Sequence, residues 1–266
     1  MTASRITHIS SADNPQFKQL KKLAGSARAR RDARQTLLDG THLLQALADA
    51  GGMLALLVLS AGAEQSAEIT QCMARFPTVP VISLPPKLFA ALSPVETPVG
   101  ILGLLDIPHA AEQAYRCGVL LENIQDPGNL GGILRTAAAA GVEAVYLSSG
   151  CAEAWSPKAL RAGMGAQFTL AIREHQDLAA VAVQFDVVVA TALNAERSIF
   201  DLDLTGAVAF VFGNEGAGLS EDLLQRATHI ATIPMPGSVE SLNVAAAAAI
   251  CLFERVRQCA QRSVAR

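Results

Sequence analysis

Residues 211–220 read VFGNEGAGLS, and residues 233–244 read IPMPGSVESLNV. Each stretch begins with an apolar run, passes through a turn rich in glycine or proline, and leads into the start of a helix. Glycine lets the backbone approach a ligand closely, and ligands bind at the open end of a parallel sheet. Two turns of this kind predict one pocket, with Glu215, Ser241 and Asn243 at its rim.

A third junction of the same layout spans residues 122–135. Asn129 is expected at or near the start of its helix, where its side chain could hold the turn rather than contact a substrate. Arg135 stands alone among leucine and alanine residues. It could pair with an acid or a helix end, or it could bind a phosphate or a substrate. The three junctions together predict a nucleotide-sized pocket at one edge of the sheet.

Unbroken apolar runs alternate with helical stretches from residue 119 onward, which is typical of a parallel sheet covered on both faces. The first hundred residues also alternate short strands and helices, and a polar segment follows them. We therefore expect an α/β protein with a small domain at residues 1–106 and a larger one at residues 117–266. Ser241 is expected to cap the long final helix.

The composition is that of a folded globular protein, because 51% of the 266 residues are hydrophobic and 17% are charged. The longest apolar run, residues 244–253, is shorter than the roughly 20 residues of a membrane span. The N-terminus lacks the apolar core of a signal peptide, so we expect a cytoplasmic protein. The five cysteines lack metal-ligand spacing, which predicts buried free thiols and no metal site.

The charge is distributed unevenly. Residues 5–34 hold eight basic and two acidic residues, a net charge of +6, which leaves −9 for the rest of a chain whose total is −3. A basic end on an acidic body favours a polyanionic partner such as a nucleic acid, and a solvated helix face is the alternative. The candidate RNA-binding residues are Lys18, Lys21, Lys22, Arg28, Arg30, Arg31 and Arg34.

Several common sites are absent from the sequence. There is no G-x-x-x-x-G-K-[ST] phosphate loop, and GNEGAG at residues 213–218 does not fit the dinucleotide pattern G-x-G-x-x-G. No histidine lies in the three junctions, so nucleophilic hydrolysis assisted by histidine is poorly supported. The residues alone therefore indicate an α/β protein that binds a nucleotide-like ligand and carries a basic N-terminal segment.

The three junctions resemble the motifs of SpoU-type (TrmH-like) RNA 2′-O-ribose methyltransferases of the SPOUT superfamily. The matching stretches are NIQDPGNLGGILRTA at 123–137, FGNEGAGL at 212–219 and IPMPGSVESLNVA at 233–245, with KALRAGMGA at 158–166 as an intervening segment. The resemblance covers residues 119–254. The first hundred residues resemble, more loosely, the small RNA-binding domain of the family.

This resemblance implies S-adenosylmethionine as the methyl donor, bound in a deep trefoil knot formed by the C-terminal part of the chain. General rules of chain topology would not predict a knot. It also implies a homodimer with the site near the subunit interface. In the family the cofactor lies against the backbone of the second and third motifs. The residues concerned here are Gly213, Ile233, Met235 and Leu242, with Leu193 as a further candidate.

The implied reaction is in-line transfer of a methyl group to a ribose 2′-hydroxyl of RNA. The family assigns removal of the hydroxyl proton to the arginine that matches Arg135. Because a guanidinium does not lose its proton readily, binding the target phosphate and stabilising the developing oxyanion is an equally good role. Asn129, Glu215, Ser241 and Asn243 match the other active-site positions, where positioning and hydrogen-bonding roles are expected.

Ribosomal RNA is the expected substrate, because a separate N-terminal α/β domain resembles the ribosomal RNA subgroup of the family. A transfer RNA 2′-O-methyltransferase is one alternative. Another is a non-catalytic RNA-binding or ribosome-assembly factor with the same fold. A nicotinamide-dependent oxidoreductase fits the fold class but lacks the dinucleotide fingerprint.

Overall fold

The computed structural model describes residues 6–111, 113–193 and 195–264, so Arg5 of the basic segment lies outside the described residues. The chain divides into two compact units. Unit 1 consists of Met1–Pro108 and Trp155–Phe168, and unit 2 consists of His109–Ala154 and Thr169–Arg266. The segment Trp155–Phe168, which falls within the second domain expected from the sequence, thus packs with the first unit. The assignment of separate functions to residues 1–106 and 117–266 stays a prediction.

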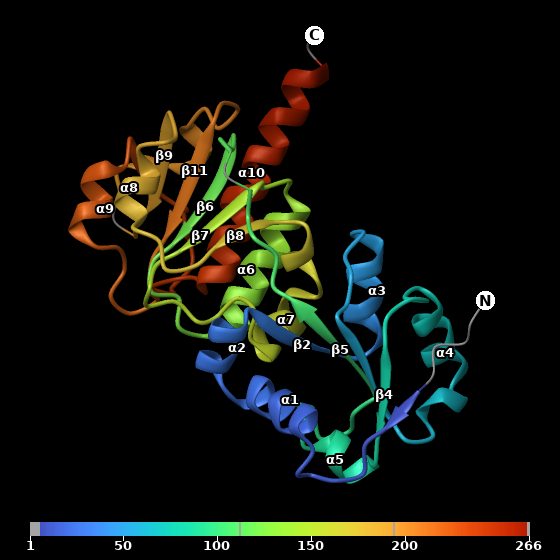
Figure 1. Ribbon diagram of the computed structural model, residues 1–266. Coiled ribbons are helices and arrows are strands. Elements are labelled where there is room, and N and C mark those ends of the chain that lie inside the picture. The colour runs from blue at the N-terminus through green and yellow to red at the C-terminus, as the bar shows by residue number, and fades with distance from the viewer. Residues whose placement is uncertain (1–5, 112, 194, 265–266) are drawn as a thin grey trace. The chain divides into compact units, whose positions relative to one another are not determined.

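Unit 1 is built on a five-stranded mixed sheet with the strand order β1-β4-β3-β5-β2 (Figure 1). The strands are β1 (Thr7–His8), β2 (Gln35–Asp39), β3 (Leu56–Ser60), β4 (Val81–Leu84) and β5 (Ile101–Asp106). Strands β1, β4 and β3 pair in parallel, whereas β5 runs antiparallel to both β3 and β2. The sequence predicted the alternation of strands and helices in this region but not its mixed strand directions.

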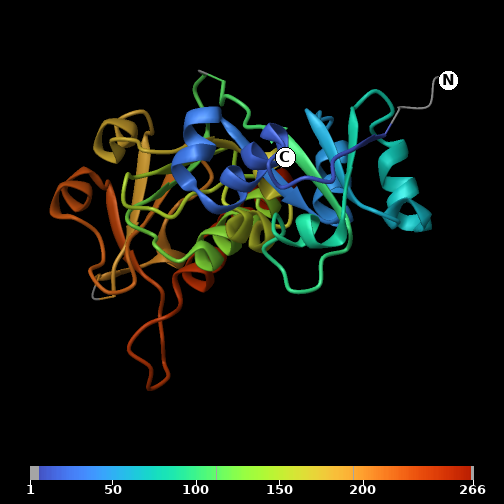
Figure 2. The same ribbon diagram turned by 60° about the horizontal axis from the view of Figure 1, so that its bottom comes forward.

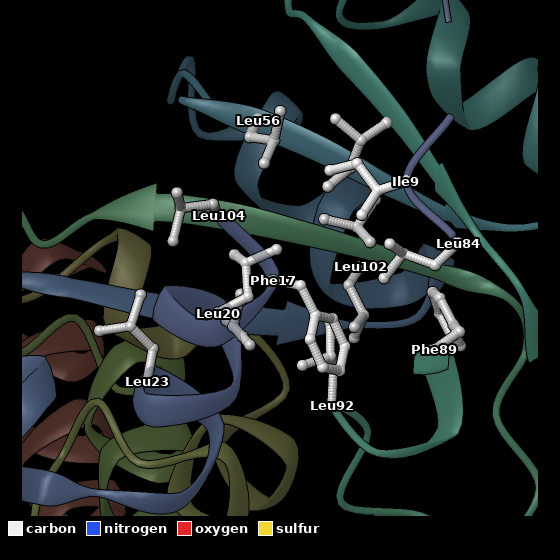
Figure 3. Packing of buried hydrophobic residues seen from close by; sticks show 13 residues of the cluster. Ile9, Phe17, Leu20, Leu23, Leu56, Leu84, Phe89, Leu92, Leu102 and Leu104 are labelled. Carbon is white, nitrogen blue, oxygen red and sulfur yellow. The ribbon is translucent and has the colours of Figure 1, made fainter. Parts of the chain in front are cut away.

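Helices cover both faces of this sheet. They are α1 (Pro15–Gly25), α2 (Ala27–Ala33), α3 (Thr41–Asp49), α4 (Ala67–Ala74), α5 (Pro86–Ala90) and α7 (Pro157–Gly163), with short 3-10 turns at Ala63–Gln65 and Ala166–Phe168. Phe17 and Leu20 of α1 and Phe89 of α5 lie in one apolar cluster with side chains from one face of the sheet (Figure 3). Helix α3 lies on the opposite face, because a Cβ at Gly103 would be 2.5 Å from Leu44 Cδ2.

Unit 2 is built on a seven-stranded sheet in which every pairing is parallel, in the order β10-β12-β9-β11-β6-β7-β8. The strands are β6 (Cys117–Leu121), β7 (Ala144–Leu147), β8 (Ala171–Arg173), β9 (Val187–Thr191), β10 (Arg197–Ser198), β11 (Val208–Phe212) and β12 (His229–Thr232). The predicted parallel α/β fold is therefore confirmed. The carboxyl ends of β9, β11 and β12 meet at one edge of the sheet.

Helices cover both faces of the parallel sheet. They are α6 (Pro127–Ala139), α8 (Leu178–Ala182), α9 (Glu221–Arg226) and α10 (Val244–Val264), with a 3-10 turn at Ile199–Asp201. Side chains of α8 and α9 lie in one apolar cluster with Leu120, Tyr146 and Val211. Helices α6 and α10 pack against each other, and a Cβ at Gly132 would lie 3.5 Å from Ala245 Cβ. The small residues thus let these two helices approach closely.

Two helix starts differ from the sequence interpretation. Helix α10 begins at Val244, and the Asn243 side chain accepts from the backbone N–H groups of Ala245 (3.0 Å) and Ala246 (3.4 Å). The expectation that Ser241 caps this helix is therefore wrong, because the chain becomes helical only after Asn243. Helix α6 is capped by Asp126, whose carboxylate accepts from the Asn129 backbone N–H at 2.8 Å.

The basic N-terminal segment forms two consecutive helices, α1 and α2, with Ser26 between them. Arg30 on α2 is only 5% exposed, and its guanidinium donates to the Leu23 carbonyl at 2.6 Å and the Ala24 carbonyl at 3.4 Å. These carbonyls belong to the last turn of α1, where a cation is favourable. The prediction that Arg30 contacts RNA is therefore wrong, because its buried guanidinium is hydrogen-bonded to the end of α1 and holds α2 against that helix.

We expect Arg30→Met to lower the free energy of unfolding of unit 1 by about 1.5–3 kcal/mol, because it removes charged hydrogen bonds to buried carbonyls. The measurement is urea unfolding followed by tryptophan fluorescence. The single tryptophan, Trp155, is buried in unit 1 and reports on that unit. Arg31→Met on the same helix is the control, since Arg31 is exposed. Equal unfolding curves for both variants would contradict the role of Arg30.

All five cysteines are free thiols, as the sequence predicted, and Cys72, Cys117 and Cys251 are buried. Burial raises the pKa of Cys117 to about 11 and that of Cys251 to about 12. Both thiols are therefore protonated at neutral pH and are poor nucleophiles. No helix among the described residues is both long and apolar enough to cross a lipid bilayer.

Candidate active site

A cavity of about 960 Å³ opens in unit 2 at the carboxyl ends of β9, β11 and β12. Its lining comes mainly from Thr191–Leu193 and Ala195–Arg197 at and beyond the end of β9, Gly213–Leu219 after β11, and the segment that follows β12. This position is the one at which open parallel sheets bind ligands. The cavity is within the size range of small-molecule sites.

The five predicted cofactor-binding residues all line this cavity. They are Leu193, Gly213, Ile233, Met235 and Leu242. Leu193 is 56% exposed although it is a large apolar residue. An apolar side chain that faces an open cavity rather than the core is typical of a ligand-contacting position. The assignment of these five residues to the cofactor stays a prediction, which their shared position supports.

The loop Gly213–Gly218 has a tightly closed backbone. The backbone of Asn214 exchanges hydrogen bonds with Gly218 at 3.1 and 2.9 Å, and the Asn214 side-chain oxygen accepts from the N–H groups of Gly216 and Ala217. A Cβ at Gly213 would lie 2.3 Å from the Gly218 carbonyl oxygen, so only glycine fits there. The glycine at 213 is thus required by the close approach of two backbone segments within the loop, and the predicted approach of this backbone to a ligand stays a prediction.

A chain of hydrogen bonds joins one residue from each of the three motifs. The Asn129 side-chain amide donates to the Glu215 carboxylate, and the Asn243 side-chain amide donates to the Asn129 side-chain oxygen at 3.0 Å. Asp126 holds the turn before α6, so the Asn129 side chain is left to link the motifs. Glu215 and Ser241 also line the cavity. The network thus links three separate segments beside the cavity, and of its three residues only Glu215 lines the cavity itself.

Arg135 lies on the exposed side of α6. It forms no hydrogen bond or ion pair with any of the residues that the structure describes. The structural alternative, in which Arg135 pairs with an acid or a helix end, is therefore not seen in the described part of the chain. A guanidinium without an internal partner is suited to bind a phosphate or a carboxylate from outside.

The sequence interpretation placed the first motif in the wall of the pocket, but none of its described residues lines the cavity. The first motif reaches the cavity only through the contact between Asn129 and Glu215. The interpretation also missed Thr191, Glu196 and Arg197, which line the cavity after β9. The signal that could have found them is their position after an apolar strand in the same sheet.

Two protein-family models and several known proteins match this chain. Residues 116–253 match the SpoU rRNA Methylase family, and residues 14–103 match the MRM3-like substrate binding domain. An uncharacterised tRNA/rRNA methyltransferase of Synechocystis sp. is 35% identical over 96% of this chain and 95% of its own. The 23S rRNA (guanosine(2553)-2′-O)-methyltransferase RlmP of Bacillus subtilis is 30% identical over 93% of this chain and 98% of its own.

One similar solved structure contains a cofactor. It is the SpoU methyltransferase AviRb from Streptomyces viridochromogenes in complex with the cofactor AdoMet. It superimposes with a TM-score of 0.84 at 27% sequence identity, and the match covers 92% of this chain and 98% of that chain. The family match spans more than half of the chain and includes all three motifs that meet at the cavity. The chain therefore belongs to the SpoU rRNA methylase family.

Proposed function

We propose that this protein transfers a methyl group from S-adenosylmethionine to a ribose 2′-hydroxyl of ribosomal RNA. The observation that carries the proposal is a hydrogen-bonded chain that links the first motif to the two motifs that line one cavity. Asn129, Glu215 and Asn243 come from different motifs and form one hydrogen-bonded chain at the rim. The full-length relative in Bacillus subtilis, which is named for 2′-O-methylation of 23S rRNA, supports ribosomal over transfer RNA.

The lining of the cavity fits S-adenosylmethionine. Apolar side chains such as Leu193, Ile233 and Leu242 can cover an adenine ring, and the glycine loop exposes backbone groups for polar contacts. The charged residues of the lining are Glu196, Glu215 and Arg197. Two carboxylates and one guanidinium give a net charge of −1, which complements the net positive charge of the sulfonium cofactor.

The bound cofactor would supply an electrophilic methyl group, so that a carbon–sulfur bond breaks as the bond to the ribose oxygen forms. The chain's own contribution is alignment and charge. Arg135 would bind the target phosphate and stabilise the negative charge that develops on the oxygen. Through their hydrogen bonds, Asn129 and Asn243 would hold the loop that carries Glu215 in a fixed position relative to the ribose hydroxyl. The hydroxyl proton leaves to solvent or to a group of the site.

The exposed basic residues of α1 and α2 are the proposed RNA-binding surface. Lys21, Lys22 and Arg31 are exposed. Lys18 and Arg28 are also exposed and form surface ion pairs with Asp13 and Asp32, which RNA phosphates can replace at little cost. Arg34 is a weaker candidate, because its guanidinium donates to the carbonyls of Ile107 and Pro108 at 3.2 and 3.4 Å.

We expect the triple substitution of Lys21, Lys22 and Arg31 by serine to weaken RNA binding and to flatten its dependence on salt. Each phosphate contact contributes about 0.7–0.9 to the slope of log Kd against log salt, so the loss of three contacts should lower the slope by about 2–3. The measurement is a filter-binding titration with ribosomal RNA fragments at several salt concentrations. An unchanged slope would place the RNA-binding surface elsewhere.

Arg75→Ser is the matched control for this experiment. Arg75 follows α4, which packs against α3 on the opposite face of the unit 1 sheet. Its removal costs one positive charge and an exposed ion pair with Asp49, which is worth little stability. The control should bind RNA with the wild-type affinity and salt dependence.

The function is tested by incubating the purified protein with radiolabelled S-adenosylmethionine and total RNA from a strain that lacks the gene. We expect label in one ribosomal RNA, at a linkage that resists alkaline cleavage because its 2′-hydroxyl is methylated. Label in transfer RNA would preserve the chemistry and overturn the substrate. Absence of label, with the cofactor still bound, would favour a non-catalytic binding protein.

The trefoil knot and the homodimer are also part of this proposal. The 48% exposure of Phe253 on α10 supports an apolar subunit interface along this helix. Sedimentation equilibrium tests the homodimer, and a monomer at micromolar concentration would contradict it.

The segment between β12 and α10, which holds the third motif, is a long projecting loop (Figure 2).

A further inference from the structure

Two consecutive residues after β6, Glu122 and Asn123, accept hydrogen bonds from the two ends of the loop that follows β11. The Glu122 carboxylate accepts from the Ser220 backbone N–H at 2.7 Å, just beyond the end of the loop. The Asn123 carbonyl accepts from the Asn214 side-chain amide at 3.0 Å, at the start of the loop. The loop between these contacts supplies Gly213–Leu219 to the cavity wall.

The contact with Asn123 controls the shape of the loop through the Asn214 amide group. The nitrogen of this amide is held by the Asn123 carbonyl, so its oxygen must point the other way. That oxygen accepts from the N–H groups of Gly216 at 2.9 Å and Ala217 at 3.0 Å. The orientation of one side chain therefore sets the direction of two backbone groups in the cavity loop.

Asn123 itself is held in an uncommon conformation. Its φ is 56°, in the left-handed region, which asparagine tolerates better than most residues. The Ser148 hydroxyl oxygen, at the end of β7, accepts from the Asn123 backbone N–H at 3.0 Å. A Cβ at Gly150 would lie 1.9 Å from the Asn123 side-chain oxygen, so the glycine leaves room for this side chain. The conformation that aims the Asn123 carbonyl at Asn214 is thus fixed by its neighbours.

We propose that Glu122 and Asn123 are positioning residues for methyl transfer. They hold the loop Gly213–Leu219 in the shape that binds S-adenosylmethionine and that carries Glu215 to Asn129. Neither residue lines the cavity, so both act through Asn214 and Ser220. This inference rests on the proposed function, because it concerns the affinity of the same cavity for the same cofactor.

The test compares paired variants of the full-length chain by calorimetry with S-adenosylmethionine. Asn123→Ala should raise the Kd about tenfold, because the left-handed conformation is unfavourable for alanine. Asn123→Gly should bind nearly as the wild type, because glycine adopts this conformation freely and keeps the carbonyl. Glu122→Ala should also raise the Kd about tenfold by removing a charged acceptor, and Glu122→Gln should restore most of the affinity.

Two further measurements distinguish positioning of the cavity loop from a general effect on protein stability. The KM for S-adenosylmethionine should rise in Asn123→Ala while kcat and the affinity for RNA stay near wild type. In a double-mutant cycle, Asn123→Ala should add little to Asn214→Ala, since the first residue acts through the second.

If Asn123→Ala and Glu122→Ala bind S-adenosylmethionine with the wild-type affinity, or if the effects in the cycle are additive, this inference is wrong and the proposed function still stands. A wild-type protein that binds no S-adenosylmethionine would overturn the proposed function, and this inference with it.

Discussion

Arg135→Ala should lower the rate of methyl transfer about a hundredfold or more, while the Kd for S-adenosylmethionine stays near that of the wild type. The size of the effect is that of removing one donor to a developing oxyanion. Arg135 is exposed on α6 and is not among the residues that line the cavity, so its loss should leave cofactor binding intact. The measurement is single-turnover methyl transfer beside calorimetry.

Arg135→Lys tests whether the planar guanidinium is needed beyond its charge. A lysine keeps the charge but cannot bind a phosphate through two parallel hydrogen bonds, so a large loss of activity would indicate two-point binding of the phosphate. Arg262→Ala is the control, because Arg262 is an exposed arginine of the same unit that pairs with Asp203. Wild-type turnover in Arg135→Ala would remove Arg135 from the catalytic residues.

The part of this molecule that could be predicted is the part with a local pattern. Apolar runs ending in glycine or proline turns identified the strands of unit 2 and the ends that face the cavity. The resemblance of three motifs then selected Gly213, Ile233 and Leu242, which line one cavity in the structure. These residues are identified by their immediate neighbours in the chain, so the sequence alone is informative about them.

The missed features depend on contacts that no local pattern reveals. Arg30 lies among other arginines and has no local sign of burial, yet its guanidinium is fixed by the carbonyls of Leu23 and Ala24 at the end of the preceding helix. Asn123 reads as an ordinary turn residue, and its role depends on Asn214, 91 positions away. Trp155–Phe168 lies inside the sequence range of the SpoU family match but packs with unit 1. The contacts of Asn123 and of Trp155–Phe168 join segments that are distant in the chain, so they form only when the tertiary structure is assembled.

Gly213→Ala should weaken S-adenosylmethionine binding by roughly ten- to a hundredfold, the equivalent of an overpacking cost of about 1–3 kcal/mol. The added Cβ would lie 2.3 Å from the carbonyl oxygen of Gly218 and 2.8 Å from the backbone nitrogen of Leu219. Because both are backbone atoms, no side-chain rotation relieves the clash. The loop must open, which breaks the paired hydrogen bonds between Asn214 and Gly218.

Gly206→Ala is the matched control for this substitution, because Gly206 lies in the same unit and a Cβ there would meet nothing within 4 Å. Thermal unfolding should show a small change for both variants, since none of the residues Gly213–Gly218 belongs to the apolar cluster of unit 2. A large loss of affinity in Gly213→Ala without loss of folding would locate the cofactor against this loop. Equal affinities for the two variants would show that the cavity tolerates an open loop, and the cofactor would then have to bind against the segments after β9 and β12 instead.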